Sequence, residues 1–218
     1  LIEEIKLAWA DWMVLVFRDQ KLDREAHKAF GRRFGELHVH LVNHTRPDHD
    51  QEIFTVKTTD KTAYTAGEAW HADVTCDEIP PMASMLYITE TPECGGGDTL
   101  FANMYMAYEM LSPAMKTFLA DKKAVHNGGK PYAGNAPPTD GYPHHEHPVI
   151  ATHPDTGRKV LYVSSGFTTH IVGLKRFESE VLLDMCHNLL KDEPKLHCRV
   201  RWEPNTLTFW DNRCTQHN

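Results

Sequence analysis

A histidine and an aspartate separated by one residue, His71 and Asp73, carry side chains that divalent metal ions bind. The valine and threonine that follow favour an extended chain, in which side chains two positions apart point the same way. The imidazole and the carboxylate can then reach one ion, while Ala72 points away. A histidine from another strand would complete a two-histidine, one-carboxylate site, which leaves three positions open on octahedral Fe(II) and suits oxygen activation. Zinc accepts the same ligand types, so the pattern leaves the metal open.

A second pair of the same spacing, His153 and Asp155, shows that spacing alone decides nothing. Two such pairs are close to the number that chance gives in a chain with 15 histidines. Residues 153–157 read His-Pro-Asp-Thr-Gly, and proline, aspartate and glycine are favoured in tight turns. We therefore predict that this pair forms the tip of a hairpin, and the metal-binding candidates are His71 and Asp73.

The segments that must position these residues are mostly β-type after residue 37. The expected strands are 13–17, 53–57, 83–89, 160–163, 199–202 and 206–210. Helical spacing of apolar residues predicts helices at 1–12, 23–34, 104–111, 113–121 and 175–191. Asp23 is placed as an N-cap and Gly35 as a C-terminal stop. Strands without βαβ alternation favour a mainly β fold with helices, as a β sandwich or jelly roll.

One stretch, residues 127–148, is rich in glycine, proline and histidine and is predicted to be a long loop. Its histidines His144, His145 and His147 resemble a metal patch, but flanking prolines favour surface or lid residues. We hypothesise that this loop closes over a substrate.

The composition indicates a globular protein, with 41% hydrophobic residues, 24% charged residues and a formal charge of -7. This charge argues against a nucleic-acid partner, because phosphate binding needs a basic surface. The longest apolar run, residues 13–17, is too short to cross a membrane. None of the five cysteines forms a Cys-x-x-Cys pair, which fits a reducing compartment, so we expect a cytoplasmic location.

Four segments together resemble the taurine dioxygenase family, whose members act on taurine, other alkyl sulfonates and sulfates, and aryloxyalkanoates. They are Glu68–Thr75 (EAWHADVT), Gly96–Phe101 (GGDTLF), Gly166–Ile171 (GFTTHI) and Trp210–His217 (WDNRCTQH). The resemblance implies a double-stranded β-helix (jelly-roll) core flanked by α-helices. It also implies an enzyme that uses Fe(II), 2-oxoglutarate and O2 to hydroxylate a small organic anion, and a homo-oligomer.

Carried over residue by residue, the resemblance makes His71, Asp73 and His217 the three iron ligands. Thr99 matches the threonine that donates a hydrogen bond to the distal carboxylate of 2-oxoglutarate. The family's 2-oxoglutarate arginine lies a little beyond the third ligand, past Asn218, so we expect a single domain, 1–218, that is truncated at both ends. Arg213 matches a different, structural arginine.

The same resemblance points to a substrate pocket. His40 matches the family's sulfonate-binding histidine, Val74 matches a backbone contact to the same anion, and Phe167 would line the pocket. Where the taurine enzyme has a tyrosine and an asparagine near the substrate amine, this chain has Asn43 and Gly67. Losing both would leave an ammonium group poorly compensated in a desolvated pocket, so the predicted substrate is a small anion other than taurine.

Two other functions are compatible with the ligand set. A zinc hydrolase on a β scaffold would use the same residues to activate water, but it has no use for Thr99. A non-catalytic jelly-roll binding protein would carry the histidines incidentally, and it predicts no tight metal binding. Dependence on 2-oxoglutarate separates the dioxygenase from both.

Overall fold

The fold is taken from a computed structural model, which describes residues 1–44, 50–59, 67–93, 95–133 and 141–218. In these residues the helices are α1 (Ile2–Trp12), α2 (Arg24–Gly31), α3 (Leu41–His44), α4 (Met104–Glu109), α5 (Pro113–Leu119), α6 (Arg176–Asp192) and the 3-10 helix η1 (Pro194–Leu196). The strands are β1 (Val14–Phe17), β2 (Ala83–Ile88), β3 (Thr99–Asn103), β4 (Lys123–Asn127), β5 (His144–Pro148), β6 (Ile150–Thr152), β7 (Lys159–Leu161), β8 (Thr168–Ile171), β9 (His197–Val200), β10 (Thr206–Asp211) and β11 (Thr215–His217). The prediction of a mainly β protein with helices is confirmed.

Every strand pair in the described residues is antiparallel. The sheets run in the orders β1-β10-β2, β11-β3-β9, β5-β4-β8 and β6-β7. β10 is fully buried along its length, which explains its run of apolar residues and threonines. A tight turn after β10 carries the chain directly into β11, so two consecutive strands belong to different sheets.

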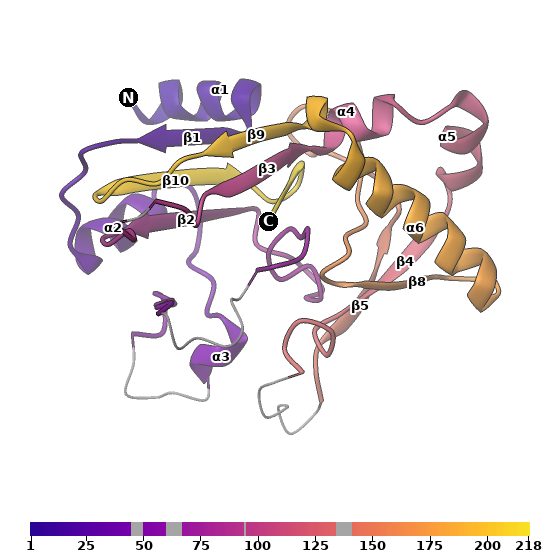
Figure 1. Cartoon of the computed structure of the whole chain (residues 1–218), viewed down its shortest axis with the longest axis horizontal. Coiled ribbons are helices and arrows are strands. Elements are labelled where there is room, and N and C mark those ends of the chain that lie inside the picture. Colours follow the sequence, from indigo (N-terminus) through magenta and orange to yellow (C-terminus); the bar gives the residue numbers. More distant parts are fainter. Residues whose placement is uncertain (45–49, 60–66, 94, 134–140) are drawn as a thin grey trace.

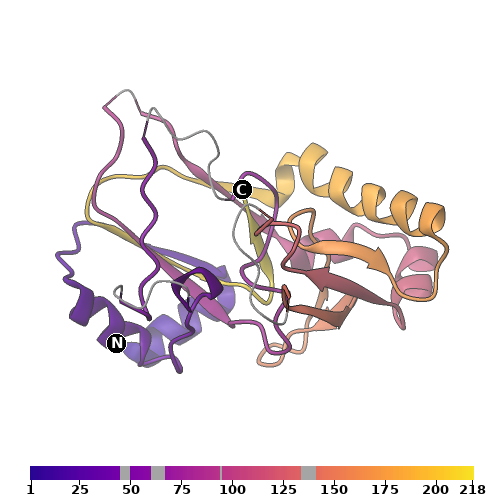
Figure 2. The same ribbon diagram turned by 90° about the horizontal axis from the view of Figure 1, so that it is seen from below.

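The helices cover the two ends of the molecule (Figures 1 and 2). α1 and α2 lie at the end formed by the β1-β10-β2 sheet, and α6 lies along the opposite end beside the β5-β4-β8 sheet. The largest apolar cluster includes buried residues of α4, β7, β8 and α6, such as Tyr105, Leu161, Ile171 and Leu190. The last strand, β11, runs between these two ends, so the C-terminal residues are central rather than peripheral.

The helix predictions are largely confirmed, and local capping explains where the helices begin. The Asp23 carboxylate accepts from the backbone N–H of Ala26 at 2.7 Å, as expected of an N-cap. The C-terminal stop differs, because α2 ends at Gly31 and not at Gly35. Similarly, the hydroxyl of Ser112 caps α5 through the N–H of Met115.

The structure also differs from the sequence predictions in two longer segments. Residues 53–57 are not a strand: Phe54 stacks on His40 with ring centroids 4.6 Å apart, and the carbonyl of Ile53 accepts from the side chain of Asn43 instead of a neighbouring strand. Residues 127–148 are not one loop, because residues 144–148 form β5 and pair with β4. The strand was hidden by composition, since it lacks the β-branched and aromatic residues that are typical of strands and ends in proline.

The histidines of β5 lie in a paired strand, in which His144 is exposed, as predicted for a surface residue, and His145 and His147 are half-buried. His147 packs near the buried His126, and its Nε2 lies 3.0 Å from the carbonyl oxygen of Asp77. Residues 134–140 lie outside the described part of the chain, so the hypothesis that this segment closes over a substrate stays a prediction. Within the described residues, no helix is both long enough and apolar enough to span a membrane.

Candidate metal centre and active site

An isolated antiparallel bridge brings the first and last predicted ligands together. The backbone N–H of His71 donates to the carbonyl of His217 at 3.0 Å, and the N–H of His217 donates back at 2.8 Å. Residues that exchange both hydrogen bonds present their side chains on one face. The two imidazoles therefore lie side by side, with ring centroids 4.1 Å apart.

Asp73 reaches the same point by a route that the sequence did not predict. Residues 73–76 form a turn, not an extended strand, and Val74 adopts a left-handed φ of 50°. The turn closes through the N–H of Asp77, which donates to the carbonyl of Val74. Asp73 Oδ1 lies 3.6 Å from His71 Nε2 and 3.8 Å from His217 Nε2. The strand argument was wrong in its geometry, although the three side chains do converge.

The orientation of His71 and the protonation of His217 suit a metal ion. The Nδ1 atom of His71 is 2.6 Å from the carbonyl oxygen of Ala69, which can only accept, so Nδ1–H donates to it and Nε2 faces Asp73 Oδ1. Burial, together with the neighbouring His71, lowers the pKa of His217 to about 4. His217 is therefore a neutral imidazole at pH 7, the form that binds metals.

The carboxylate is held in its charged form. Partial burial opposes ionisation of Asp73, but the two imidazoles and the hydroxyl of Ser84 outweigh it and lower the pKa. Ser84 donates to Asp73 Oδ2 at 2.6 Å, whereas Oδ1 faces the histidines. The three ligand atoms all lie within 4.8 Å of one another, so a single ion can bridge them. The residues present fit a two-histidine, one-carboxylate metal site.

A glycine supports the first ligand closely. A Cβ atom added to Gly166 would lie 2.8 Å from the Cβ of His71, and the N–H of Gly166 donates to the carbonyl of Trp70 at 3.0 Å. The next residue, Phe167, is buried with Val74 and Cys76, and its ring lies 6.3 Å from that of His71. Gly166 was noted only as the first residue of a motif, and its packing against His71 was not predicted.

Thr99 lies at the start of β3, next to β11 and β9. Its hydroxyl oxygen accepts from the indole N–H of Trp202 at 3.0 Å. Two positions along β3, and thus on the same face, Phe101 contacts His217 and Trp210. Thr99 therefore belongs to the face of the sheet that carries the third ligand, and Trp202 is a partner that was not predicted.

The predicted substrate residues are only partly brought together. His40 lies in hydrogen-bond reach of the hydroxyl of Tyr132 at 3.2 Å, and Tyr132 packs on the cluster that includes Val74 and Phe167. Burial raises the pKa of Tyr132 well above its usual value, so its hydroxyl stays protonated. Asn43 is buried, but its amide nitrogen is directed to the backbone carbonyls of residues 50, 51 and 53. Its role in substrate binding stays a prediction.

A second group of metal-binding residue types, His153, Asp211 and Cys214, is fully buried. Its carboxylate is already neutralised, because Arg213 donates to Asp211 through Nε at 2.9 Å and through Nη2 at 2.7 Å. His153 Nε2 lies 3.0 Å from the same carboxylate. The predicted hairpin tip is confirmed, since residues 154–156 turn between β6 and β7, and Arg213 also pairs with Asp155. This group is a buried ion-pair network.

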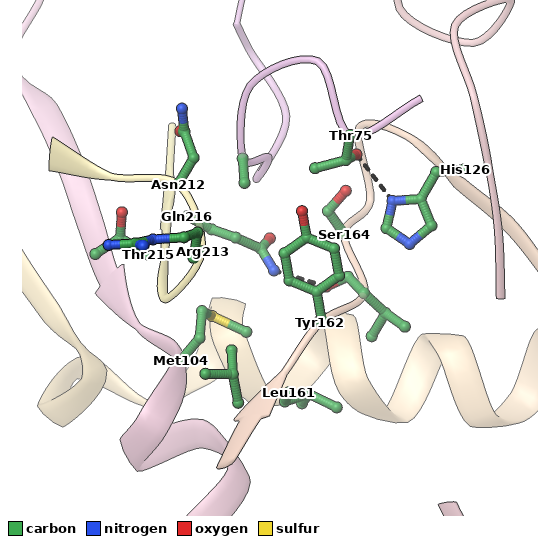
Figure 3. Close-up of a pocket in the computed structure, with 13 residues that line it drawn as sticks. Thr75, Met104, His126, Leu161, Tyr162, Ser164, Asn212, Arg213, Thr215 and Gln216 are labelled. Atoms are coloured by element: carbon green, nitrogen blue, oxygen red, sulfur yellow. Dashed lines mark hydrogen bonds between the residues drawn. The ribbon is translucent and has the colours of Figure 1, made fainter. Parts of the chain in front are cut away.

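A small cavity lies next to the triad but does not include it (Figure 3). Its lining comes from residues that neighbour the ligands in sequence, such as Ala72 and Gln216, and from His126 on β4 and Tyr162, which follows β7. The hydrogen bond between Thr75 and His126, 2.8 Å long, closes one side. None of the predicted ligand or substrate residues lines this cavity, so it belongs to the packing behind the metal-binding turn.

Comparison with known proteins identifies the family. The family model described as "Taurine catabolism dioxygenase TauD, TfdA family" matches residues 1–218. A Saccharomyces cerevisiae protein named alpha-ketoglutarate-dependent sulfonate dioxygenase is 34% identical over 99% of this chain and 56% of its own length. A crystal structure of a taurine dioxygenase from Burkholderia xenovorans is 35% identical, with a TM-score of 0.83 over 99% of this chain and 72% of that one. The structure titled AAD-2 in complex with Mn(II) and N-oxalylglycine is 26% identical, with a TM-score of 0.80 over 100% of this chain and 79% of that one.

The chain spans between about half and two thirds of the length of the first curated relatives that it matches. The match nevertheless covers all of this chain, and it includes each segment that builds the candidate metal centre. The chain belongs to the TauD/TfdA family of dioxygenases.

Proposed function

We propose that this protein is an Fe(II)- and 2-oxoglutarate-dependent dioxygenase that hydroxylates a small organic anion. The observation that carries the proposal is the convergence of His71 Nε2, Asp73 Oδ1 and His217 Nε2 within 4.8 Å. Three protein ligands on one side of an octahedral ion leave three positions for a co-substrate and O2. Family membership and the names of the relatives support the same reaction.

The proposal assigns the metal to His71, Asp73 and His217. When bound, Fe(II) with 2-oxoglutarate and O2 supplies the oxidation that hydroxylates a C–H bond, with succinate and CO2 as co-products. The carbonyl of Ala69 holds the ring of His71 so that Nε2 would be the atom that binds the metal. Burial keeps His217 neutral, so its imidazole is ready to bind without first losing a proton.

Thr99 is proposed to hold the distal carboxylate of 2-oxoglutarate. Its hydroxyl accepts from the indole N–H of Trp202, which occupies one lone pair of the oxygen. The single hydroxyl proton of Thr99 is then free to point at an anionic oxygen, where a hydrogen bond is stronger than to a neutral acceptor.

The substrate is proposed to lie against His40, Val74 and Phe167. Val74, a β-branched residue, has a left-handed φ of 50°, and strain of this kind is often kept where backbone groups meet a ligand. His40 is orientated by the hydroxyl of Tyr132, and Phe167 contributes an apolar wall. An imidazole beside an apolar wall suits a sulfonate, sulfate or carboxylate attached to a short carbon chain.

The wider architecture is part of the proposal. Antiparallel pairing throughout the described sheets, with β10 and β11 in different sheets, supports a jelly-roll core within one domain. A cytoplasmic homo-oligomer without nucleic-acid or membrane partners is proposed from the net charge of -7, the cysteine pattern and the family resemblance.

Anaerobic titration with Fe(II) and then 2-oxoglutarate tests the proposal. We expect a visible charge-transfer band that His71→Ala and Asp73→Ala abolish and that His144→Ala, an exposed histidine on β5, leaves intact. Succinate release then ranks alkyl sulfonates, alkyl sulfates and aryloxyalkanoates as substrates. Tight zinc binding without any band would contradict the dioxygenase and favour a hydrolase.

A further inference from the structure

The two oxygens of Asp73 have different surroundings. Oδ1 faces the imidazoles of His71 and His217, as a metal ligand must. Oδ2 instead accepts a hydrogen bond of 2.6 Å from the hydroxyl of Ser84 on β2. A short hydrogen bond from a hydroxyl to a carboxylate is among the stronger ones that proteins form. One oxygen is therefore presented to the metal while the other is held by the protein.

The direction of that hydrogen bond is set by Asn212. The Nδ2 atom of Asn212 donates to the oxygen of Ser84 at 2.9 Å. A hydroxyl has one proton, and the oxygen that accepts from Asn212 must give its own proton to another acceptor. The nearest acceptor is Asp73 Oδ2, so Ser84 is a donor to the carboxylate.

Asn212 is itself fixed and cannot easily rotate to reverse this order. It is buried, and its Oδ1 accepts from the indole N–H of Trp210 at 3.0 Å and from the backbone N–H of Asp73 at 3.2 Å. The register of the sheet pairs Trp210 with Ser84, which places Ser84 directly across from the end of β10. Asn212 thus links β10, β2 and the metal-binding turn.

We infer that Ser84, orientated by Asn212, is a positioning residue that keeps Asp73 a one-oxygen ligand. The inference rests on the proposed function, because it concerns how the metal is held. An octahedral ion with two histidines and one carboxylate oxygen keeps three open positions. If Oδ2 also bound the ion, only two would remain, and the co-substrate and O2 would no longer fit together.

Manganese(II) binding to the full chain tests this role without turnover. Ser84→Ala removes the donor, Ser84→Thr keeps a hydroxyl, and Thr208→Val is the control. Thr208 is a buried threonine on the neighbouring β10 whose hydroxyl has no hydrogen-bond partner in the described residues. Affinity is measured by calorimetry, and the water bound to each Mn(II) is measured by the relaxation of solvent protons. Thermal unfolding without metal reports whether each variant folds.

We expect Ser84→Ala to weaken Mn(II) binding by about 10- to 100-fold, as is usual when a group that orientates a ligand is lost. Water fills the open positions on the ion, and we expect their number to fall from three toward two in Ser84→Ala because Asp73 Oδ2 then also binds. The relaxation enhancement per bound ion should therefore fall by about one third. Ser84→Thr and Thr208→Val should behave as the unchanged protein does.

Unchanged affinity in a folded Ser84→Ala variant would overturn the inference, and so would weaker binding with an unchanged enhancement per bound ion. A failure of the unchanged protein to bind Mn(II) would instead overturn the proposed function. If Ser84→Ala does not fold, a Ser84→Thr variant with weakened binding and lowered enhancement would count against the role of the hydroxyl.

Discussion

His71 and His217 are supported in different ways although they face the same point. The Nδ1 atom of His71 has a carbonyl partner in Ala69, whereas the buried Nδ1 of His217 has no hydrogen-bond partner among the described residues. His217 is positioned instead by its backbone in β11 and by the rings of Phe101 and Trp210. Packing is thus the main restraint on the third ligand, and hydrogen bonding is the main restraint on the first.

Gly166→Ala tests how closely the packing holds His71. The added methyl group would lie 2.8 Å from the Cβ of His71, and the bridge to His217 prevents the backbone from moving away. We expect a loss of about 1–3 kcal/mol in the free energy of unfolding, typical of overpacking, and weaker metal binding. Denaturant unfolding and metal titration measure the two effects. Gly35→Ala is the matched control, since its methyl group would make an ordinary contact of 3.7 Å with Met82; an equal loss in both variants would contradict the argument.

Residue types and spacing were enough to select the metal ligands but not the residues that support them. His71, Asp73 and His217 stand out because only a few side chains bind metals. Ser84 and Gly166 act through their positions, namely a cross-strand register and a close approach to His71, and neither feature has a local sequence signal. Asn212 lay inside a recognised motif, but its partners Asp73 and Ser84 come from segments more than 100 residues away.

At the scale of elements, the β5-β4-β8 sheet carries a buried histidine that the sequence did not mark. His126 on β4 is fully buried between Thr75, Thr168 and the ring of Tyr162. Its register partner lies on β5, in the stretch that was predicted to be a loop. Helices were easier to predict because apolar periodicity and caps are local, whereas these short strands are set by pairing partners that the sequence does not reveal.

His126 makes the stability of this sheet sensitive to acid. Burial, followed by the charge of His147, lowers the pKa of His126 to about 3, below the usual value of 6.5. Between pH 6.5 and pH 3, His126 therefore binds a proton in the unfolded chain but not in the folded chain. The contribution of neutral His126 to the free energy of unfolding is fully present above pH 6.5 and is lost as the pH falls toward 3.

His126→Gln should reduce this acid dependence. Between pH 6 and pH 4 the contribution of one such histidine approaches about 1.4 kcal/mol per pH unit. Urea unfolding with a chelator present, at pH 8, 6, 5 and 4, measures the slope for both proteins. At pH 8 the imidazole is neutral in both the folded and the unfolded chain. The difference in the free energy of unfolding between the two proteins at that pH therefore gives the packing cost of the substitution alone. Parallel pH curves for the two proteins would show that His126 does not titrate as described.

At the scale of the whole molecule, the site joins segments that are far apart in the chain. The turn at residues 73–76 provides one ligand, β11 provides another, and residues 166–167 close the wall beside them. β11 runs between the two ends of the molecule, so both ends must fold for the ligands to meet. The mainly β class followed from short β-type segments without βαβ alternation, but the order of strands within the sheets depends on long-range pairing that no local pattern encodes.

Metal binding should therefore stabilise the whole fold, because the unfolded chain cannot hold its three ligands together. At a free Mn(II) concentration about 100-fold above the dissociation constant, the expected gain is about 2.7 kcal/mol. In a protein of this size that gain corresponds to a rise in Tm of about 5–11 °C. Asp73→Ala should remove the metal-dependent rise, and Asp184→Ala, an exposed carboxylate on α6, should retain it. Differential scanning fluorimetry with Mn(II) or with chelator measures both. A full metal-dependent rise in the Tm of Asp73→Ala would place the stabilising metal elsewhere in the protein. If the rise is lost in Asp73→Ala and kept in Asp184→Ala, the metal that stabilises the fold is bound at the site between the two ends.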